Sequence, residues 1–301
     1  MSSARRWPDV RLVDRFARPR RAAVIALLTL CAGATPLVAA AQAAPAYGDA
    51  LYQPKLRQAG KDVMWLPTPD AMVARMLAAA RTSPRDIVYD LGAGEGRIPI
   101  AAARDFGARA VGIEYDPELA ALATRNVARA GVADRVRIIA GDVFKEDFTQ
   151  ASVVTLYLLP DLNQQLRQQI LALKPGTRVV SYMWDMGEWE PDETIALGGD
   201  QAFLWTVPAL INGRWTVRDG SGRVAATLTV TQRFQRIGGT IAADGPVQPL
   251  LGAFMQGPTM GFTFVGSDGG VRNARLRIDG ARASGAMNFV DQSTPITATR
   301  D

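Results

Sequence analysis

A short stretch between Ile87 and Arg97 combines glycines and acids in a spacing that suits ligand binding. It reads I-V-Y-D-L-G-A-G-E-G-R, so three β-prone residues are followed by Asp90 and then by glycines at 92, 94 and 96. Glycine lets the backbone bend sharply and approach a ligand, and a helix that begins there points its free N–H groups at the same place. The pattern predicts a strand, a glycine turn and a helix start, with an acid placed to accept a hydrogen bond from an amine.

The spacing of the glycines distinguishes two classes of ligand. A dinucleotide-binding turn has the spacing G-x-G-x-x-G, which would require glycine at position 97, where this chain has Arg97. An acid shortly before the first glycine also suits a cationic or amine-bearing ligand better than a pyrophosphate. A nicotinamide-dependent oxidoreductase is therefore disfavoured, and it remains one alternative.

An alternation of strand and helix patterns must position these residues. We expect strands at 86–91, 109–115, 135–140, 151–158, 177–184, 193–197 and 201–207, and helices at 71–81, 96–106, 117–130 and 161–173. Strands separated by such helices form a parallel sheet with right-handed crossovers, which binds ligands at the carboxyl ends of its strands. We predict a Rossmann-like, doubly wound, mostly parallel α/β sheet with Asp90, Glu114, Asp142 and Tyr157 at that edge. Taken singly, each acid is interpreted as a solvated loop residue or a helix cap. Three acids at consecutive strand ends indicate a ligand site.

The segment before the first helix reads V-M-W-L-P-T-P over residues 63–69. Pro67 and Pro69 disfavour helix at the residues that precede them, so we expect this segment to be extended. We also expect Thr68 or Asp70 to cap the helix that follows.

Beyond residue 208 the pattern changes to short alternating runs without a convincing helix. The runs cover 214–218, 224–234, 237–242, 260–265, 271–278 and 281–289. They are separated by turn pairs such as Asp219-Gly220 and Asp279-Gly280, which is typical of an antiparallel meander, sandwich or small barrel. We therefore expect an irregular arm at 44–62, an α/β domain at 63–208 and a small antiparallel all-β domain at 209–301.

The first 43 residues have the features of a secretory signal peptide. A basic stretch, R-P-R-R at 18–21, precedes an apolar run at 22–30 and an A-Q-A site at 41–43. The apolar run is short for a stable membrane span. We expect cleavage after Ala43 and export to the periplasmic or extracellular side. An uncleaved anchor is the alternative, and membrane contact is expected only in that case.

The composition excludes several kinds of chemistry. The formal net charge of +5 belongs to residues 1–43, since the rest of the chain carries as many acids as bases. This balance gives no reason to expect nucleic acid as a partner. The chain has no histidine, and its single cysteine, Cys31, lies in the leader. His-based triads, thiolate nucleophiles and metal sites built on His or Cys are therefore excluded for the processed chain.

The stretch D-x-G-x-G-x-G resembles motif I of the class I, seven-strand methyltransferases that bind S-adenosylmethionine. Further motifs extend this resemblance over most of residues 63–192. They are W-L-P-T-P, V-G-I-E-Y-D-P, G-D-V-F, T-L-Y-L-L-P and M-W-D-M-G-E-W-E-P-D. Together they look like the FAM173-type lysine methyltransferases and, more distantly, the Dot1 histone-lysine methyltransferases. The resemblance implies a doubly wound sheet, S-adenosylmethionine as cofactor and a protein lysine as methyl acceptor.

The resemblance also implies roles for individual residues. We expect Asp90 to accept from the cofactor ammonium, Glu114 to bind the ribose hydroxyls and Asp142 to accept from the adenine amino group. The remaining cofactor contacts are expected from the backbone of the turn, from Val143 or Phe144 against the adenine ring, and, by analogy, from Thr68 to the cofactor carboxylate. The turn comprises Gly92, Gly94, Glu95 and Gly96. No metal is implied.

Methyl transfer would be an in-line displacement by a deprotonated amine, with catalysis mainly by positioning. A narrow apolar channel would lower the pKa of the incoming lysine. Tyr157 and Trp65 are the candidates to line it as catalytic residues, Trp184 is a further one, and residues 157–160 would border it. Core packing is an equally good interpretation of these aromatic residues.

Two features depart from the family pattern, namely the export leader and the all-β tail. They leave open an exported cofactor-binding or non-catalytic binding protein that acts through its C-terminal β domain. The acceptor, the role of the tail and the oligomeric state do not follow from the sequence.

Overall fold

The computed structural model describes residues 47–59 and 64–301. The predicted signal peptide and its cleavage site lie outside these residues. No helix in the described part of the chain is long and apolar enough to cross a membrane.

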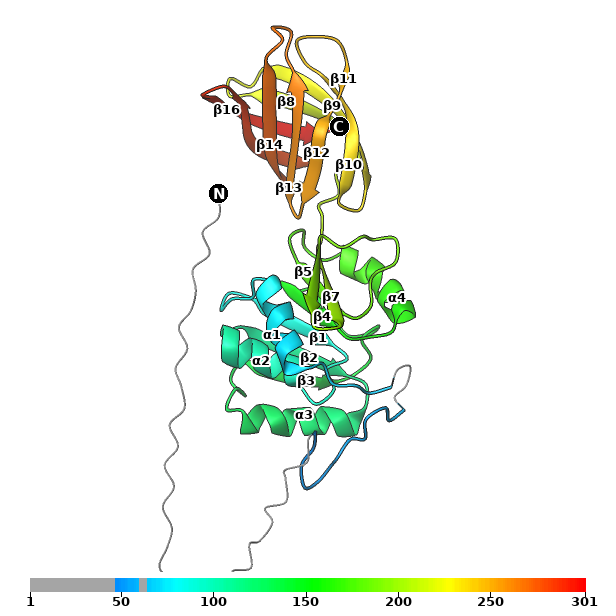
Figure 1. Ribbon diagram of the computed structural model, residues 1–301. Coiled ribbons are helices and arrows are strands. Elements are labelled where there is room, and N and C mark those ends of the chain that lie inside the picture. Colours follow the sequence, from blue (N-terminus) through cyan, green and yellow to red (C-terminus); the bar gives the residue numbers. More distant parts are fainter. Residues whose placement is uncertain (1–46, 60–63) are drawn as a thin grey trace, which may run out of the picture. The chain divides into compact units, whose positions relative to one another are not determined.

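The first sheet has seven strands in the order β3-β2-β1-β4-β5-β7-β6 (Figure 1). Its strands are β1 (Ile87–Leu91), β2 (Arg109–Glu114), β3 (Val136–Ala140), β4 (Val153–Leu156), β5 (Arg178–Tyr182), β6 (Glu193–Leu197) and β7 (Asp200–Thr206). Neighbours among β1–β5 pair in parallel, whereas β7 pairs antiparallel with both β5 and β6. The chain therefore has the predicted doubly wound, mostly parallel sheet, and the order reverses between β1 and β4.

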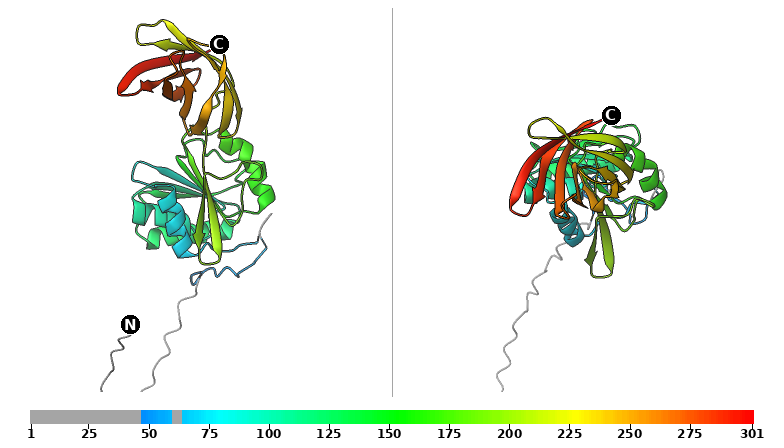
Figure 2. Two further views of the ribbon diagram at one scale, coloured as in Figure 1. Left: turned by 45° about the horizontal axis from the view of Figure 1, so that its top comes forward. Right: turned by 90° about the horizontal axis from the view of Figure 1, so that it is seen from above.

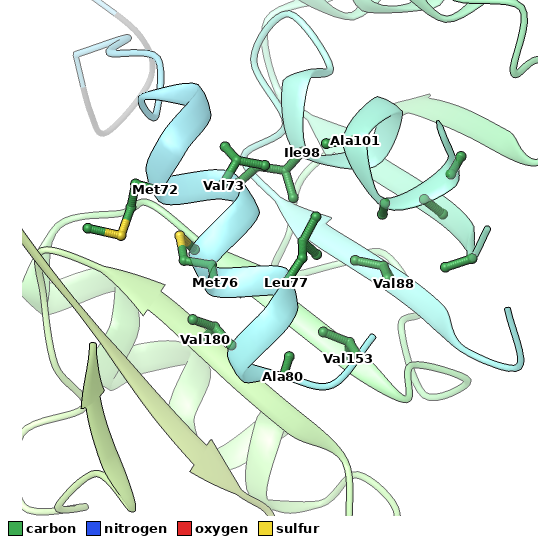
Figure 3. Packing of buried hydrophobic residues seen from close by; sticks show 14 of the residues in the cluster. Met72, Val73, Met76, Leu77, Ala80, Val88, Ile98, Ala101, Val153 and Val180 are labelled. Carbon is green, nitrogen blue, oxygen red and sulfur yellow. The ribbon is translucent and has the colours of Figure 1, made fainter. Parts of the chain in front are cut away.

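Helices cover both faces of this sheet because neighbouring residues of a strand point to opposite sides. The helices are α1 (Asp70–Ala79), α2 (Arg97–Phe106), α3 (Pro117–Arg129) and α4 (Pro160–Leu171). On β4, Val153 faces the cluster that includes α1 and α2, and the next residue, Val154, faces the cluster that includes Leu166 of α4. Figure 3 shows α1 lying on the first of these faces. The labelled side chains are Met72, Val73, Met76, Leu77, Ala80, Val88, Ile98, Ala101, Val153 and Val180.

The starts of α1 and α3 differ in how they are capped. Asp116 caps α3, and its carboxylate accepts from the backbone N–H groups of Glu118 and Leu119, as its Asp-Pro sequence suggests. The prediction that Thr68 or Asp70 caps α1 was wrong. The cap residue is Pro69, without a side-chain hydrogen bond, and Asp70 is the first residue of the helix. The carboxylate of Asp70 pairs with Arg97 instead.

The second sheet is antiparallel and has the order β11-β10-β9-β8-β16-β15-β14-β13-β12. Its strands are β8 (Gly213–Asp219), β9 (Val224–Arg233), β10 (Arg236–Ala242), β11 (Gln248–Pro249), β12 (Leu251–Gln256), β13 (Thr259–Val265), β14 (Val271–Asp279), β15 (Arg282–Phe289) and β16 (Gln292–Arg300). The outermost strands of this order, β11 and β12, are separated in the chain by Leu250 alone, whose N–H donates to the carbonyl of Gly239 on β10. The sheet therefore curves round until its two edges meet, as the views of Figure 2 show.

The second sheet is therefore a small closed barrel, one of the three arrangements (meander, sandwich or barrel) that the sequence left open. The interior is filled by side chains, including Trp215, Phe264 and Leu276. Three strands, β11, β12 and β16, were not predicted. Pro295 interrupts the pattern of β16, and Gly252 with its positive φ of 54° interrupts that of β12.

Candidate functional site

A cavity lies at the carboxyl edge of the parallel strands, where the predicted ligand residues meet. It is bordered by the glycine turn, the ends of β2, β3 and β4, and the extended segment before α1. The predicted residues that line it are Trp65, Thr68, Asp90, Gly92, Gly94, Glu95, Glu114, Asp142, Val143, Phe144 and Tyr157. Gly96 does not line it but caps α2, with a left-handed φ of 85°.

The glycine turn is shaped by what packs against it. Gly92 and Gly94 have φ values of 87° and 55°, in the region that disfavours other residues. A Cβ on Gly94 would lie 2.8 Å from the indole Nε1 of Trp65, and one on Gly92 would lie 2.9 Å from Leu158. The glycines are thus needed both for the bend and for the close approach of side chains that border the cavity.

Asp90 is buried at the end of β1. Its Oδ1 accepts from the hydroxyl of Thr155 on the neighbouring strand β4, at 2.7 Å. Burial, reinforced by the charges of Glu114 and Glu95, raises the pKa of Asp90 to about 8. A cationic partner beside such a buried carboxyl group would stabilise its ionised form.

Glu114 ends β2 and is buried next to the turn. Its two oxygens accept from the backbone N–H groups of Gly94, at 2.7 Å, and Asp116, at 2.9 Å. Burial raises its pKa above the usual value, and these two hydrogen bonds oppose the rise. A carboxylate has about four acceptor positions, so Glu114 can hold the turn and still accept from a diol.

Asp142 and Val143 follow β3 on the other side of the cavity. Asp142 accepts from the N–H of Phe144 at 3.1 Å, and its second oxygen lies 3.9 Å from the ammonium of Lys145. Val143 and Phe144 are half-buried and face the same cavity. An acceptor beside apolar side chains suits a planar base with an amino group.

Glu95 and Thr68 are both buried. The carboxylate of Glu95 accepts from Arg97 Nε at 2.9 Å, and its carbonyl accepts from the side chain of Asn126 at 2.8 Å. These two contacts stabilise the turn. The sequence did not predict these contacts of the Arg97 and Asn126 side chains, because neither residue type is specific to such a role.

Of the predicted catalytic residues, Trp65 lies on the glycine turn. Its ring packs edge-on against Tyr47, with centroids 5.6 Å apart, in addition to its contact with Gly94. Tyr157 follows β4 and packs against Tyr182 of β5, with centroids 4.5 Å apart. Trp184 is 39% exposed and does not line the cavity.

The described part of the arm, residues 47–59, also reaches this site. Asp49 pairs with Arg125 at 2.6 Å and with Arg129 at 3.2 Å, both on α3. Chiefly through its hydrogen bond, Arg125 lowers the pKa of Asp49. Tyr47 packs against Trp65, and the guanidinium of Arg97 lies 5.7 Å from its ring. The sequence predicted an irregular arm without a role, since such distant pairings leave no local signal.

The residues fit S-adenosylmethionine by the chemistry of their donors and acceptors. A buried acid that needs a cation, a second acid able to accept from a diol and a third acid beside apolar side chains lie in sequence order around one cavity. Among the described residues no group of three His, Cys, Asp or Glu is placed to hold a metal ion.

Comparison with known proteins also indicates a methyltransferase. Residues 90–193 match the sequence model of the ANTKMT methyltransferase domain. A protein-lysine N-methyltransferase of Saccharolobus islandicus is 45% identical over 135 residues, which cover 44% of this chain and 84% of that protein. An adenine nucleotide translocase lysine N-methyltransferase of Mus musculus is 34% identical over 137 residues, which cover 45% of this chain and 59% of that protein.

A solved structure, an RNA methyltransferase from Salinibacter ruber in complex with S-adenosyl-L-homocysteine, is 52% identical in sequence. The match covers 48% of this chain and 96% of that one, with a TM-score of 0.48. From the motifs, the strand order and the curated relatives together, the chain belongs to the family of S-adenosylmethionine-dependent protein-lysine N-methyltransferases.

Proposed function

We propose that this protein transfers a methyl group from S-adenosylmethionine to the side-chain amine of a lysine in another protein. The observation that carries the proposal is the continuous cavity that joins the three acids of the cofactor side to Tyr157. The names of the two relatives support the type of acceptor.

The residues of the chain would bind and orient the two reactants. When bound, S-adenosylmethionine supplies a methyl group on a sulfonium, which is already activated for displacement. Asp90 would accept from its ammonium and Glu114 from its ribose hydroxyls, while Asp142 with Val143 would hold the adenine. Thr68, buried just before α1, would donate to its carboxylate.

Tyr157 would border the path of the incoming amine. A lysine amine is mostly protonated near neutral pH, and it must lose this proton before it can attack. The half-buried aromatic surface of Tyr157 and the neighbouring ring of Tyr182 favour the neutral amine by keeping water away. Positioning of the amine in line with the methyl group then supplies most of the rate increase.

The first test is calorimetric titration of the purified full chain with S-adenosylmethionine and, separately, with NAD. We expect micromolar binding of S-adenosylmethionine alone. Binding of NAD instead would identify an oxidoreductase and contradict the proposal.

The second test follows radiolabelled methyl groups from S-adenosylmethionine into a lysate, with protein and RNA separated before counting. We expect label in protein, recovered as methyl-lysine after acid hydrolysis. Label confined to RNA would contradict a lysine acceptor. Cofactor binding without transfer to any macromolecule would favour a binding protein that acts through its β domain.

The variant Tyr157→Phe links this activity to the geometry. It removes a hydroxyl at the acceptor side and keeps the ring that packs against Tyr182, so we expect slower methyl transfer with unchanged cofactor affinity. Equal loss of transfer and of affinity would assign Tyr157 a packing role.

We also propose that the protein works on the periplasmic or extracellular side of the membrane. The support is the basic, apolar and A-x-A pattern of residues 18–43. Cell fractionation combined with N-terminal sequencing tests it, with mature protein that begins at Ala44 as the expected result. Full-length protein in the membrane fraction would indicate a retained anchor, and full-length protein in the cytoplasm would contradict export.

A further inference from the structure

A row of two tyrosines and one aspartate, Tyr157, Tyr182 and Asp200, extends across the ends of three strands from Tyr157, which lines the cavity. Tyr157 directly follows β4, whose last residue, Leu156, pairs with Ser181 of β5, so Tyr157 lies beside Tyr182. Tyr182 in turn is opposite Ala202 of β7. Because side chains alternate across a strand, Asp200 lies on the same face as a diagonal neighbour of Tyr182.

Direct contacts link the three side chains. The rings of Tyr157 and Tyr182 have their centroids 4.5 Å apart at an interplanar angle of 59°. The hydroxyl of Tyr182 donates to Oδ2 of Asp200 at 2.8 Å. After Tyr182 the chain turns at Met183, which has a φ of 67°, and the N–H of Met183 donates to the carbonyl of Gln201. The turn keeps the ends of β5 and β7 together.

The carboxylate of Asp200 can accept further hydrogen bonds. It is half-buried, and within the described ranges its only side-chain hydrogen bond is the one from Tyr182, which leaves Oδ1 without a donor. It forms no ion pair with any Arg or Lys that the structure describes, unlike Asp86, Asp49 or Asp70, which all have arginine partners.

The charge of Asp200 affects the pKa of both tyrosines. Burial, together with this charge, raises the pKa of Tyr182 and also that of Tyr157. Both phenols are therefore neutral over the physiological range. The row as a whole carries the single negative charge of Asp200, and it reaches the cavity through Tyr157.

We propose that Asp200, together with Tyr182 and Tyr157, forms a binding site for the primary ammonium group of the acceptor. The rings would contact the methylene stem of the incoming side chain, and the carboxylate would attract its positive charge. The same negative charge disfavours an anionic acceptor such as a phosphodiester. Asp200 is thus a specificity residue for cationic acceptors, an inference that rests on the proposed lysine methylation and names the form in which the side chain is first bound.

The test uses n-butylammonium as a probe of the lysine side chain. The full chain is saturated with S-adenosylhomocysteine, and binding of n-butylammonium is measured by calorimetry and by saturation-transfer NMR in an amine-free buffer. The uncharged isostere 1-butanol is measured in parallel. We expect the cation to bind the unsubstituted chain about tenfold more tightly than the alcohol, as a charge-assisted contact allows.

The variants isolate the charge. Asp200→Asn keeps an oxygen that can accept from Tyr182 but removes the charge, and we expect it to abolish the preference for the cation. Asp134→Asn, an equal charge change at the opposite edge of the sheet, should leave the preference intact. Tyr182→Phe keeps the carboxylate. We therefore expect it to lower the affinities for the cation and for the alcohol by more similar factors than Asp200→Asn does.

The outcomes separate this inference from the proposed function. If S-adenosylhomocysteine binds and the cation shows no preference, or the preference survives in Asp200→Asn, the ammonium site is wrong while methylation can still stand. If S-adenosylhomocysteine itself does not bind the unsubstituted chain, the proposed function fails first. Normal S-adenosylhomocysteine affinity in Asp200→Asn shows that the variant is folded.

Discussion

Asp90 links the stability of the protein to the cofactor binding that we propose for it. Its side chain is buried with one hydroxyl partner, and its pKa is raised to about 8. Between the ordinary value of 3.8 and 8 the folded state therefore holds a proton that the unfolded state has lost. The free energy of unfolding must decrease as pH rises through this range. A cationic ligand would reverse this loss by stabilising the ionised carboxylate.

The variant Asp90→Asn tests this linkage. Asparagine keeps an acceptor for Thr155 but does not titrate, so we expect the ligand-free variant to lose less thermal stability than the unsubstituted protein between about pH 5 and pH 8. It should also bind S-adenosylmethionine more weakly. Melting temperatures measured across that range give the comparison, and parallel curves for the two proteins would contradict the assignment.

Glu114 carries a second residue-level prediction, and the structure sharpens it. Glu114→Ala should weaken S-adenosylmethionine binding by about 2 kcal/mol, the typical value of a hydrogen bond to a charged group. Because Glu114 also accepts from the N–H of Gly94, part of this loss would come from a loosened turn. Calorimetric titration measures the affinity, and Glu118→Ala, an exposed acid in the next helix, is the control. Unchanged affinity in Glu114→Ala would rule out the ribose assignment.

At the scale of elements, the glycine turn and the extended segment before α1 form one unit. The indole of Trp65 occupies the place where a side chain at position 94 would be. Trp65 is held in turn by Tyr47, while the carboxylate of Asp49 ties the same arm to α3. The cavity is therefore bordered by segments far apart in the sequence that depend on one small residue for their contact.

The substitution Gly94→Ala tests this dependence. The new methyl group would meet Trp65 Nε1 at 2.8 Å, at a residue with a φ of 55°. Steric overlap and backbone strain together should destabilise the protein by about 2–4 kcal/mol and weaken cofactor binding.

Gly131→Ala is the matched control for this variant. Gly131 also has a positive φ, of 67°, but no atom lies within 4 Å of a Cβ there. Its cost should be that of the backbone strain alone, about 1 kcal/mol. Urea denaturation compares the two variants, and equal destabilisation would show that Trp65 moves aside freely.

At the scale of the whole described chain, the hairpin between β9 and β10 contacts the segment that follows β5. The ring of Phe234, at the tip of this hairpin, stacks on Trp189 with centroids 6.2 Å apart, and the guanidinium of Arg167 lies 5.7 Å from it. Arg167 also donates to the carbonyl of Met186, and Gln235 to that of Glu190. The segment 186–190 is thus held by Arg167 of α4 and by the turn between β9 and β10.

Phe234→Ala removes the centre of this contact. We expect a loss of about 2–3 kcal/mol in the free energy of unfolding, somewhat less than for a fully buried aromatic residue. We also expect slower methyl transfer, because Asn163 binds the carbonyls of Trp184 and Asp185 directly before this segment. Phe289→Ala, which removes a half-buried ring under Arg272 within the second sheet, should lower stability without slowing transfer. Equal rates in both variants would contradict a role of the hairpin at the acceptor side.

The first sheet and the meeting of the three acids at its carboxyl edge could be predicted from the sequence. Local patterns carried this information: apolar runs of strand length, the Asp-Pro start of α3 and acids placed at or near the ends of strands. In a parallel sheet the carboxyl ends of the strands share one edge, so the order of Asp90, Glu114 and Asp142 along the chain was enough to bring them to one cavity. The strands and helices of the first sheet were all expected, with ends displaced by a few residues at most.

The contacts between segments distant in sequence could not be predicted and became visible in the folded chain. Asp49 meets Arg125, Trp65 meets Gly94 and Asp200 meets Tyr182 because separate elements pack together, and no spacing along the chain encodes these pairs. The closure of the second sheet depends likewise on Leu250 joining its two edges, which no local pattern reports. Strand patterns repeat every two residues and specify a local conformation, whereas the partner of a side chain depends on how whole elements pack.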